Sequence, residues 1–257
     1  MNPWFKPLKS IIPYIFRIST PYGSGTGFQI LYSQAEGFCG IATAYHIIKR
    51  AYEWEENIKI THHSSNKTIV LRKGDRAIFL YPEKDLAFIL FRKNELPIET
   101  SEPTLIDSSK AARQGVEIAW CGFPAIAPPA ELCLFVGHVS CFLQKQDSYL
   151  VDGVAINGVS GGPAFYIGTE TGDSKICGVI TAYMPNRATG EILPGLCIVR
   201  PVEPYQDTFK NIRSFLDAQQ KAKEQQKEAQ KIALDDEEKK PSKAKEGKID
   251  EKKAIAD

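Results

Sequence analysis

The sequence predicts an all-β protein with a helix and a charged tail at its C-terminus. From Ile11 to about Pro204, short apolar or alternating segments are separated by Gly, Pro, Asn and Asp, which is typical of strands in a β-sandwich or β-barrel. After Pro204, apolar residues recur at helical spacing before a run rich in Lys, Glu, Gln and Ala. The length of 257 residues suffices for one large β domain or for two small barrels.

A polar segment separates two series of candidate strands. Residues 93–113 contain two prolines and several Ser, Asp and Glu residues, which interrupt the strand pattern. We interpret this segment as a crossing between two domains, at residues 1–100 and 101–204. Strands of the first series are expected at residues 14–18, 27–32, 37–43, 58–62, 68–72, 77–81 and 86–91. Strands of the second series are expected at residues 116–121, 132–142, 148–154, 163–167, 175–183 and 196–200.

The C-terminal segment 205–257 is predicted to be a helix followed by a disordered tail. Apolar residues recur at helical spacing from Phe209 to Leu216, and nearly every position that follows Ala218 is polar. Residues 235–257 form a low-complexity run rich in Lys and Glu. The tail is either a solvated extension or a tether or oligomerisation arm, and the sequence does not separate these possibilities.

The composition is typical of a globular protein and predicts no partner that binds mainly through charge. Hydrophobic residues at 43% and charged residues at 25% are ordinary values, and a formal net charge of +1 gives no reason to expect nucleic acid or a membrane surface. The longest apolar N-terminal stretch, residues 11–18, contains Pro13 and Arg17 and is too short for a membrane span or a secretory signal. We therefore expect a cytoplasmic location.

The cysteines are predicted to be buried free thiols. Each stands alone among apolar or β-forming neighbours, at Cys39, Cys121, Cys133, Cys141, Cys177 and Cys197. A free cysteine packs as a small hydrophobe, and the chain shows no sign of export to an oxidising compartment. Cysteine pairs at metal-ligand spacing are absent, so we expect neither a metal site nor another cofactor.

Segment 157–165 has the features of a turn that carries a nucleophilic serine. It reads Asn-Gly-Val-Ser-Gly-Gly-Pro-Ala-Phe, so that Ser160 lies among Gly158, Gly161 and Gly162. Small residues allow a tight turn that projects the hydroxyl and lets a substrate backbone approach. The amides of Gly158 and Ser160 can point to one place and form an oxyanion hole. Taken alone, an ordinary glycine-rich β-turn is the alternative interpretation.

His46 is the candidate base for this serine. It follows an apolar segment that ends in small residues and precedes a predicted helical turn, which places the imidazole at the rim of a barrel. His62 and His63 stand beside two serines at the end of a candidate strand, and we interpret them as exposed loop residues. His138 lies on a candidate strand, where it either packs or lines the cleft.

Asp85 is the acid expected to orient the base. It directly precedes the apolar segment 86–90, so its carboxylate can lie at the edge of the core and hold His46 in one tautomer. Asp75, in a predicted turn, and Asp107, in the polar crossing, are interpreted as solvated. The chain order His, Asp, Ser is that of chymotrypsin-type enzymes and differs from that of subtilisin and the α/β-hydrolases.

Three segments resemble the signature motifs of the trypsin and chymotrypsin superfamily. Residues 43–46 read Thr-Ala-Tyr-His, residues 85–87 read Asp-Leu-Ala, and residues 158–163 read Gly-Val-Ser-Gly-Gly-Pro. Further segments resemble the bacterial trypsin-like branch that includes the HtrA/Deg proteases; they are residues 23–28, 121–124, 137–140 and 152–157. The resemblance covers roughly residues 14–203. It implies two antiparallel six-stranded β-barrels and a serine endopeptidase that works through an acyl-enzyme.

The resemblance also implies positions that bind the substrate. Val154 corresponds to the base of the primary pocket, and Thr181 and Tyr183 lie on the strand that would bind substrate backbone, with Thr181 near Asp85. Because Val154 carries no charge and Tyr183 would crowd the pocket, we expect cleavage after small or medium apolar residues rather than after Lys or Arg. The expected partners are a protein or peptide substrate and a regulatory protein.

One departure from the family pattern keeps other functions open. Val159 occupies the position before the nucleophile, where the family carries an acidic residue or asparagine. This change and the crowding by Tyr183 favour a catalytically silent, protease-like binding module as the first alternative. An esterase, or an enzyme that processes its own chain, is the second.

Overall fold

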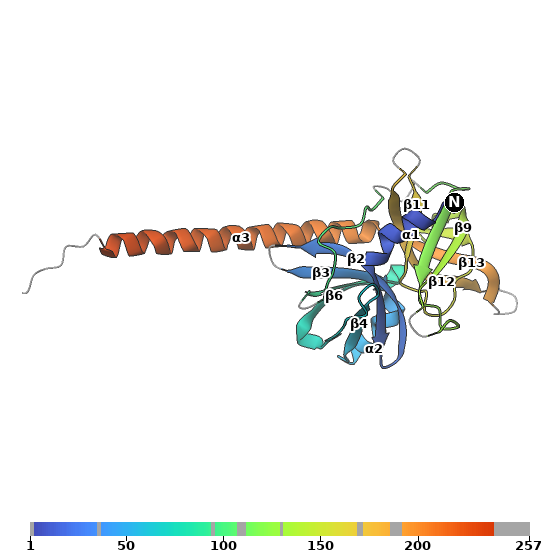
Figure 1. The fold of residues 1–257 in the computed structure, drawn as a ribbon, viewed down its shortest axis with the longest axis horizontal. Helices are drawn as coiled ribbons and strands as arrows, with labels where there is room; N and C mark the ends of the chain where they lie inside the picture. The colour runs from blue at the N-terminus through green and yellow to red at the C-terminus, as the bar shows by residue number, and fades with distance from the viewer. Residues whose placement is uncertain are drawn as a thin grey trace, which may run out of the picture. The chain divides into compact units, whose positions relative to one another are not determined.

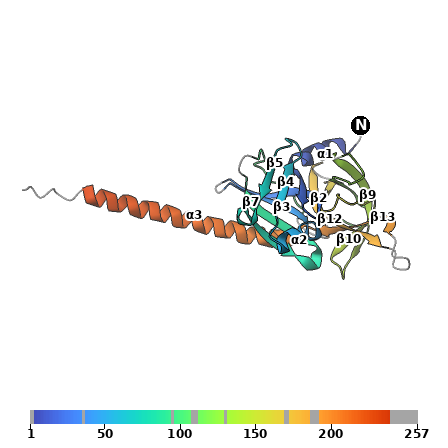
Figure 2. The same cartoon turned by 90° about the horizontal axis from the view of Figure 1, so that it is seen from below.

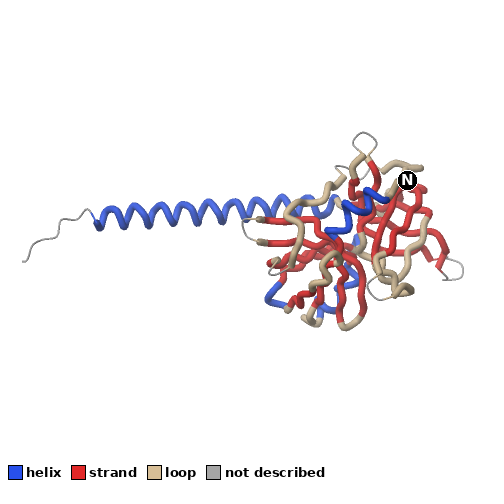
Figure 3. The backbone as a smooth tube through the Cα atoms, in the orientation of Figure 1, coloured by secondary structure: helices blue, strands red, loops and turns tan. Residues whose placement is uncertain are grey.

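The computed structural model describes residues 3–34, 37–93, 96–106, 112–128, 131–168, 172–185 and 192–238 of the chain. Met1–Lys210 form one compact unit and Asn211–Asp257 form a second. In the first unit the described residues are mostly β-strands, drawn as arrows in Figure 1 and in red in Figure 3. The predicted all-β class is confirmed.

The first half of this unit is a seven-stranded antiparallel sheet with the order β5-β4-β1-β2-β3-β7-β6. Among its strands, Figure 2 labels β2, β3, β4, β5 and β7. Its strands are β1 Ile15–Thr20, β2 Gly23–Ser33, β3 Phe38–Ala44, β4 Ile58–His62, β5 Thr68–Leu71, β6 Arg76–Tyr81 and β7 Leu86–Arg92. The sheet is a half-barrel, since no backbone ladder joins its edge strands β5 and β6 in the described residues. A side chain spans this edge instead, because the Arg76 guanidinium donates to the carbonyl of Leu71 at 2.8 Å.

The second half is a closed six-stranded barrel with the order β10-β13-β12-β11-β8-β9. Its strands are β8 Glu117–Gly122, β9 Cys133–Leu143, β10 Ser148–Asp152, β11 Pro163–Ile167, β12 Ser174–Pro185 and β13 Ile192–Pro201. Closure leaves no free strand edge in this barrel. The barrel implied by the sequence resemblance is therefore present in the second half.

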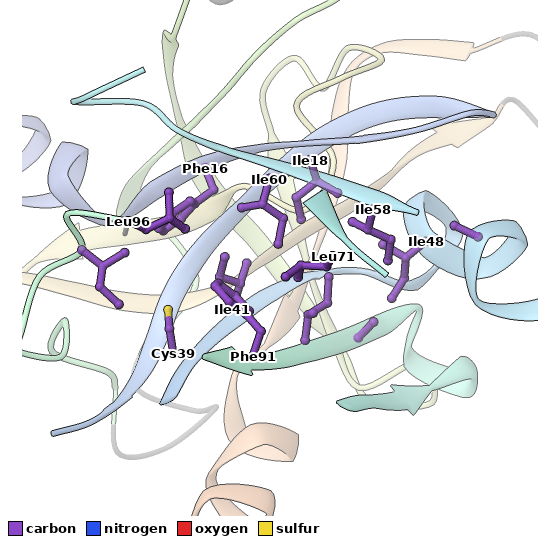
Figure 4. Close-up of a cluster of buried hydrophobic side chains, with 14 residues drawn as sticks. Phe16, Ile18, Cys39, Ile41, Ile48, Ile58, Ile60, Leu71, Phe91 and Leu96 are labelled. Atoms are coloured by element: carbon purple, nitrogen blue, oxygen red, sulfur yellow. The ribbon is translucent and has the colours of Figure 1, made fainter. Parts of the chain in front are cut away.

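Alternating apolar residues build the core of the first half. In β4, the side chains of Ile58 and Ile60 are buried, whereas Lys59 between them is exposed, as expected when successive side chains point to opposite faces of a sheet. Figure 4 shows these isoleucines gathered with Ile18 and Ile41 between the strands. Full burial of one such side chain stabilises the fold by about 1.5–3 kcal/mol.

The predicted strands are all present, and β4 and β11 have the predicted bounds. Three helical features differ from the expectation. Helix α1, Phe5–Ile11, was not expected. The helical turn predicted after His46 is the nine-residue helix α2, Tyr45–Glu53. Helix α3 spans Glu203–Glu238 and so extends into the segment predicted to be a tail. Helix α3 extends as far as Glu238 because most residues of 219–238 are Gln, Lys, Glu or Ala, which have high helix propensity. The rest of the predicted tail, residues 239–257, lies outside the described residues.

The six cysteines are free thiols, as predicted. Four of them are buried, and burial raises the pKa of Cys121, Cys177 and Cys197 to about 12, which keeps these thiols unreactive near neutral pH. The prediction of burial is wrong for Cys133 and Cys141, which are half-buried because they lie near the two ends of the long strand β9.

No helix in the described part of the chain is both long enough and apolar enough to cross a membrane.

Candidate active site

His46 and Asp85 are brought together by the pairing of two neighbouring strands. His46 lies in the first turn of α2, directly after β3, and Asp85 directly precedes β7. Ala44 at the end of β3 pairs with Leu86 at the start of β7. Because the strands are antiparallel, the residue after one and the residue before the other lie side by side. The N–H of Tyr45 fixes this junction by donating to the carbonyl of Asp85 at 3.0 Å.

The carboxylate of Asp85 contacts both the backbone and the ring of His46. Asp85 has left-handed backbone angles, φ 51° and ψ 40°, at the end of the 3-10 helix Pro82–Lys84. One carboxylate oxygen accepts the backbone N–H of His46 at 3.0 Å, and the other lies 2.8 Å from the ring Nδ1. An ionised carboxylate only accepts hydrogen bonds, so Nδ1 carries the proton. The second ring nitrogen, Nε2, is then the acceptor that a general base needs.

The turn that carries Ser160 is held by main-chain hydrogen bonds. The N–H of Val159 donates to the carbonyl of Ile156, and that of Gly162 donates to the carbonyl of Val159, each at 3.0 Å. The Gly161 N–H donates to the carbonyl of Ile180 on β12 at 2.6 Å, and the Ile180 N–H returns to Gly162 at 2.9 Å. The side chain of Val159 is fully buried. The turn is therefore ordered without an acidic side chain before the serine.

Two glycines in this turn have conformations and surroundings that exclude a side chain. Gly158 has φ +95°, and a Cβ atom there would lie 2.1 Å from the carbonyl oxygen of Phe123. Gly161 has φ +84°, and a Cβ atom there would lie 2.0 Å from the carbonyl oxygen of Thr26. These positive φ values strain residues with a side chain, and both clashes involve backbone atoms. The glycines that the sequence placed around Ser160 are thus required by the turn.

The peptide group before Gly158 is oriented by a hydrogen bond from a neighbouring loop. The carbonyl of Asn157 accepts the N–H of Ala125 at 2.7 Å. In a trans peptide the N–H points opposite to the C=O, so the Gly158 N–H is directed away from Ala125. Within the described residues, neither the Gly158 amide nor the Ser160 amide has a hydrogen-bond partner. Both amides can therefore donate to an oxyanion.

His46, Gly158 and Ser160 line one cleft of about 540 Å³. The His46 side chain is 48% exposed, so its ring is open to this space. No hydrogen bond joins the Ser160 hydroxyl to the imidazole among the described residues. Such contacts are often long in unliganded enzymes and shorten when the substrate binds. The cleft thus combines a serine hydroxyl, an imidazole held in one tautomer and two backbone donors.

Thr26 on β2 ties the first half of the unit to the nucleophile turn, and sequence reasoning did not identify it. Its N–H donates to the carbonyl of Ser160, and its hydroxyl donates to the carbonyl of Gly158, each at 2.8 Å. The same hydroxyl accepts the N–H of Phe123 at 3.1 Å. Thr26 is fully buried, so these bonds are shielded from water. The only signal was its place in the glycine-rich segment 23–28.

Tyr205 is a second residue that sequence reasoning missed. It lies in the first turn of α3, inside the Met1–Lys210 unit, and is fully buried. Its hydroxyl lies within hydrogen-bond distance of the carbonyls of Thr43, at 3.3 Å, and Ala87, at 3.2 Å. Thr43 precedes His46 by three residues, and Ala87 follows Asp85 by two. The first turn of α3 therefore supports both of the strands that carry the His46–Asp85 pair.

Removing the Tyr205 hydroxyl is expected to destabilise the protein. Tyr205→Phe keeps the ring and leaves two buried carbonyls with one donor fewer, so we expect a loss of about 1–2 kcal/mol in the free energy of unfolding. Urea denaturation followed by tryptophan fluorescence measures this difference. Tyr14→Phe is the matched control, because the Tyr14 hydroxyl bonds Ser101 in an exposed contact. Equal losses in the two variants would contradict the structural role given to Tyr205.

Two of the three predicted substrate-binding residues, Val154 and Thr181, are not among the described residues that line this cleft. The Val154 side chain is 47% exposed, and its carbonyl accepts the indole N–H of Trp120 at 3.2 Å. Thr181 is buried in β12, and no hydrogen bond joins it to Asp85 among the described residues. Tyr183 also lies in β12, paired with Cys197, but its side chain is outside the described residues. Their roles stay predictions.

The other histidines and acids occupy different places. The prediction of an exposed His62 is wrong: it is buried, with its ring nitrogens 2.9 Å from the Ser65 hydroxyl and from the Pro13 carbonyl. His63 is half-buried, and burial together with the neighbouring His62 lowers its pKa. His138 is exposed on β9, with Nδ1 3.6 Å from the Asp152 carboxylate.

The remaining acids and possible metal ligands add no second site. Asp75 lies in the 3-10 helix Lys73–Asp75, as the predicted turn implied, and Asp107 lies outside the described residues. Over the described ranges, no group of three or more His, Cys, Asp or Glu side chains is placed to hold a metal ion.

Comparison with known proteins finds solved structures with the same fold. No family model matches the sequence, and no curated protein matches it. Among solved structures, the inactive form of the Rv3671c protease matches with a TM-score of 0.53 at 15% identity, over 77% of this chain and 87% of that chain. The chain has a chymotrypsin-like fold.

Two further solved structures have the same fold. A serine-to-alanine mutant of Rv3671c from M. tuberculosis, also in its inactive form, matches with a TM-score of 0.54 at 13% identity, over 80% of this chain and 90% of that chain. A serine protease of human pathogenic astrovirus matches with a TM-score of 0.50 at 15% identity, over 76% of this chain and 92% of that chain. Because the identities are low, these matches establish the fold alone. The chemistry of the chain has to be argued from its own residues.

Proposed function

We propose that this protein is a serine endopeptidase with His46, Asp85 and Ser160 as its catalytic triad. Ser160 Oγ attacks the carbonyl carbon of the scissile peptide bond while His46 Nε2 takes the hydroxyl proton. The carbonyl oxygen becomes an oxyanion, which accepts hydrogen bonds from the Gly158 and Ser160 amides. His46 then returns the proton to the leaving amine as the C–N bond breaks, and an acyl ester remains on Ser160.

Water completes the cycle by the reverse sequence of steps. His46 removes a proton from a water molecule, whose oxygen attacks the acyl carbon, and the C–O bond to Ser160 breaks as the serine oxygen regains a proton. Asp85 accepts the hydrogen bond from the Nδ1–H of His46 throughout, so it orients the imidazole and stabilises the imidazolium that forms in each half-reaction.

The observation that carries this proposal is the shared cleft. His46, held in one tautomer by Asp85, opens onto the same cavity as Ser160 and the two amides without hydrogen-bond partners among the described residues. An ordinary glycine-rich turn would not need an oriented imidazole beside it. The fold supports the proposal, since one matched structure is described as a protease and another as a serine protease.

The finer features remain part of the proposal. Residues 1–100 and 101–204 are the two domains, with residues 205–257 as a helical and charged extension. Val154, Thr181 and Tyr183 bind substrate, and cleavage follows small or medium apolar residues. The enzyme is cytoplasmic, resembles the HtrA/Deg branch, and is restrained by a regulatory protein partner.

Labelling with a fluorophosphonate tests the nucleophile. We expect the wild type to form a covalent adduct that Ser160→Ala abolishes, because the probe phosphonylates only a serine activated by a base. The adduct is detected by in-gel fluorescence and located by mass spectrometry of peptides. Ser148→Ala is the control, since Ser148 is buried in β10 and has no histidine partner among the described residues.

Cleavage of casein separates proteolysis from the alternatives. Cleavage by the wild type and not by Ser160→Ala is expected for an endopeptidase. Labelling together with hydrolysis of a nitrophenyl ester, but no cleavage of casein or of peptides, would indicate an esterase instead. If the wild type is neither labelled nor active, the catalytically silent binding module is the correct reading and the enzyme proposal is wrong.

A further inference from the structure

Helix α2 presents two cations to the cleft that contains Ser160. Lys49 and Arg50 follow His46 by three and four residues, and such positions share one face of an α-helix. Ile48, which points to the opposite side, is fully buried in the core. The sequence of α2 therefore anchors one face in the core and directs Lys49, Arg50 and the catalytic imidazole to the same cavity.

In the part of the chain that the structure describes, these two residues are not engaged in ion pairs. Neither Lys49 nor Arg50 forms an ion pair with any described residue. The Arg50 guanidinium lies 5.5 Å from the centre of the Tyr22 ring, and the Lys49 ammonium lies 5.9 Å from that of Tyr45. An aromatic face orients a cation without cancelling its charge. Both side chains are exposed, so they can reach a ligand.

The rest of the described lining leaves the cleft positively charged. It contains no Asp or Glu; besides the residues above, it includes Gly23, Ser24, Ala125 and Asn157. Asp85 lies outside this lining, and both of its carboxylate oxygens are bonded to His46. A cleft lined by charges of one sign concentrates ligands of the opposite sign.

We propose that Lys49 and Arg50 bind a carboxylate of the substrate, so that the enzyme prefers peptides with Asp or Glu close to the scissile bond. This specificity rests on the proposed endopeptidase function. Guanidinium and ammonium groups donate charge-assisted hydrogen bonds to carboxylates, and the guanidinium can do so through two parallel bonds. The acidic residue occupies a position other than the one that enters the primary pocket, so the subsite is compatible with an apolar residue there.

Two sources could supply this carboxylate, namely an acidic side chain within a peptide and the free C-terminus of a short peptide. The side chain is the source proposed here, because endopeptidase substrates extend beyond the cleft on both sides of the scissile bond. Peptides with an amidated C-terminus carry only the side-chain carboxylate and so separate the two sources.

Binding to the Ser160→Ala protein tests the subsite without requiring turnover. Fluorescently labelled, C-terminally amidated peptides that differ only as Glu and Gln at one position are compared by anisotropy, position by position. We expect the Glu peptide to bind about tenfold more tightly at one position, and the difference to shrink as salt screens the charges. In Lys49→Gln/Arg50→Gln the two peptides are expected to bind equally.

Lys59→Gln/Lys67→Gln is the matched control, because it removes the same net charge from two exposed lysines outside the described lining of the cleft. The control is expected to keep the preference for Glu. The reversed variant Lys49→Glu/Arg50→Glu is expected to prefer peptides with Lys at the same position. Equal binding of the Glu and Gln peptides to Ser160→Ala, or a preference that survives Lys49→Gln/Arg50→Gln, would overturn the subsite.

The outcomes for the subsite and for the enzyme are distinguishable. Cleavage by the wild type without any preference for acidic peptides would reject the subsite and keep the endopeptidase. Preferential binding of acidic peptides by a protein that fluorophosphonates do not label would reject the endopeptidase, and the same two residues would then define a binding module for acidic peptides. Tighter binding only of peptides with a free C-terminus would assign the cations to a terminal carboxylate and reject the side-chain proposal.

Discussion

Asp85→Asn is expected to lower kcat on a peptide substrate by roughly 10³–10⁴-fold while leaving the fold intact. The amide oxygen of the new side chain would keep the hydrogen bond from the backbone N–H of His46. The amide NH₂ group would then face Nδ1, where the carboxylate now accepts the hydrogen bond from Nδ1–H. Nδ1 would become the acceptor and Nε2 would carry the proton, so the imidazole could not remove the proton of Ser160.

The backbone hydrogen bond makes this prediction specific. The opposite orientation of the asparagine amide would place its NH₂ group against the His46 N–H, donor against donor, so the unreactive tautomer is the stable one. Steady-state kinetics give kcat and KM, and a thermal melt checks folding. Glu83→Gln is the control, since it removes an exposed negative charge two residues away and is expected to keep wild-type activity. A kcat within tenfold of wild type for Asp85→Asn would exclude Asp85 from the triad.

Gly161→Ala is expected to destabilise the protein by about 3–5 kcal/mol, which corresponds to a fall in Tm of roughly 10 °C. The new methyl group would lie 2.0 Å from the carbonyl oxygen of Thr26 and 2.5 Å from the hydroxyl of Thr43. The Thr26 contact is with backbone of β2, which is fixed by pairing on both sides. Relief of the clash would therefore move the nucleophile turn and break the hydrogen bond from Thr26 to Ser160.

Gly115→Ala separates the clash from the backbone strain. Gly115 has φ +85°, almost the same as Gly161, but a Cβ atom there would meet nothing within 4 Å. We expect only the strain of a positive φ in this variant, about 1–2 kcal/mol. Urea denaturation of both variants gives the two free energies, and the difference between them measures the cost of overlap. Similar losses of unfolding free energy at the two positions would show that the backbone around Gly161 can move to relieve the clash at little cost.

Most of the fold was predictable because strand patterning is a local property. The alternation of apolar and polar residues in 58–62 and the turn residues between segments identified β4 and the other strands within a few residues of their bounds. Whether seven strands close into a barrel depends on the distance between edge strands, which no local pattern encodes. The open edge between β5 and β6, spanned by Arg76, was therefore not predicted.

The chemical groups of the candidate site were predictable for a similar reason. The residues that hold these groups in place were not predictable. A nucleophile turn needs glycine, and a base and its acid need particular side chains, so Ser160, His46 and Asp85 stand out among their neighbours. Thr26 and Tyr205 act through ordinary hydroxyl bonds to distant backbone carbonyls. Threonine and tyrosine occur throughout β proteins, so residue type alone does not mark them. His62 was misjudged because the buried acceptor for its ring, the Pro13 carbonyl, is distant in the sequence.

Residue types and local patterning are enough to assign the strands, the glycine-rich turn, and the hydroxyl, imidazole and carboxylate that follow the chymotrypsin order. Three features appear only in the folded molecule: the pairing of β3 with β7 that joins His46 to Asp85, the hydrogen bonds from Thr26 to the serine turn, and the cavity that Lys49 and Arg50 share with Ser160. Residue type and periodicity are set along the chain, whereas contacts between distant segments depend on how the sheets pack.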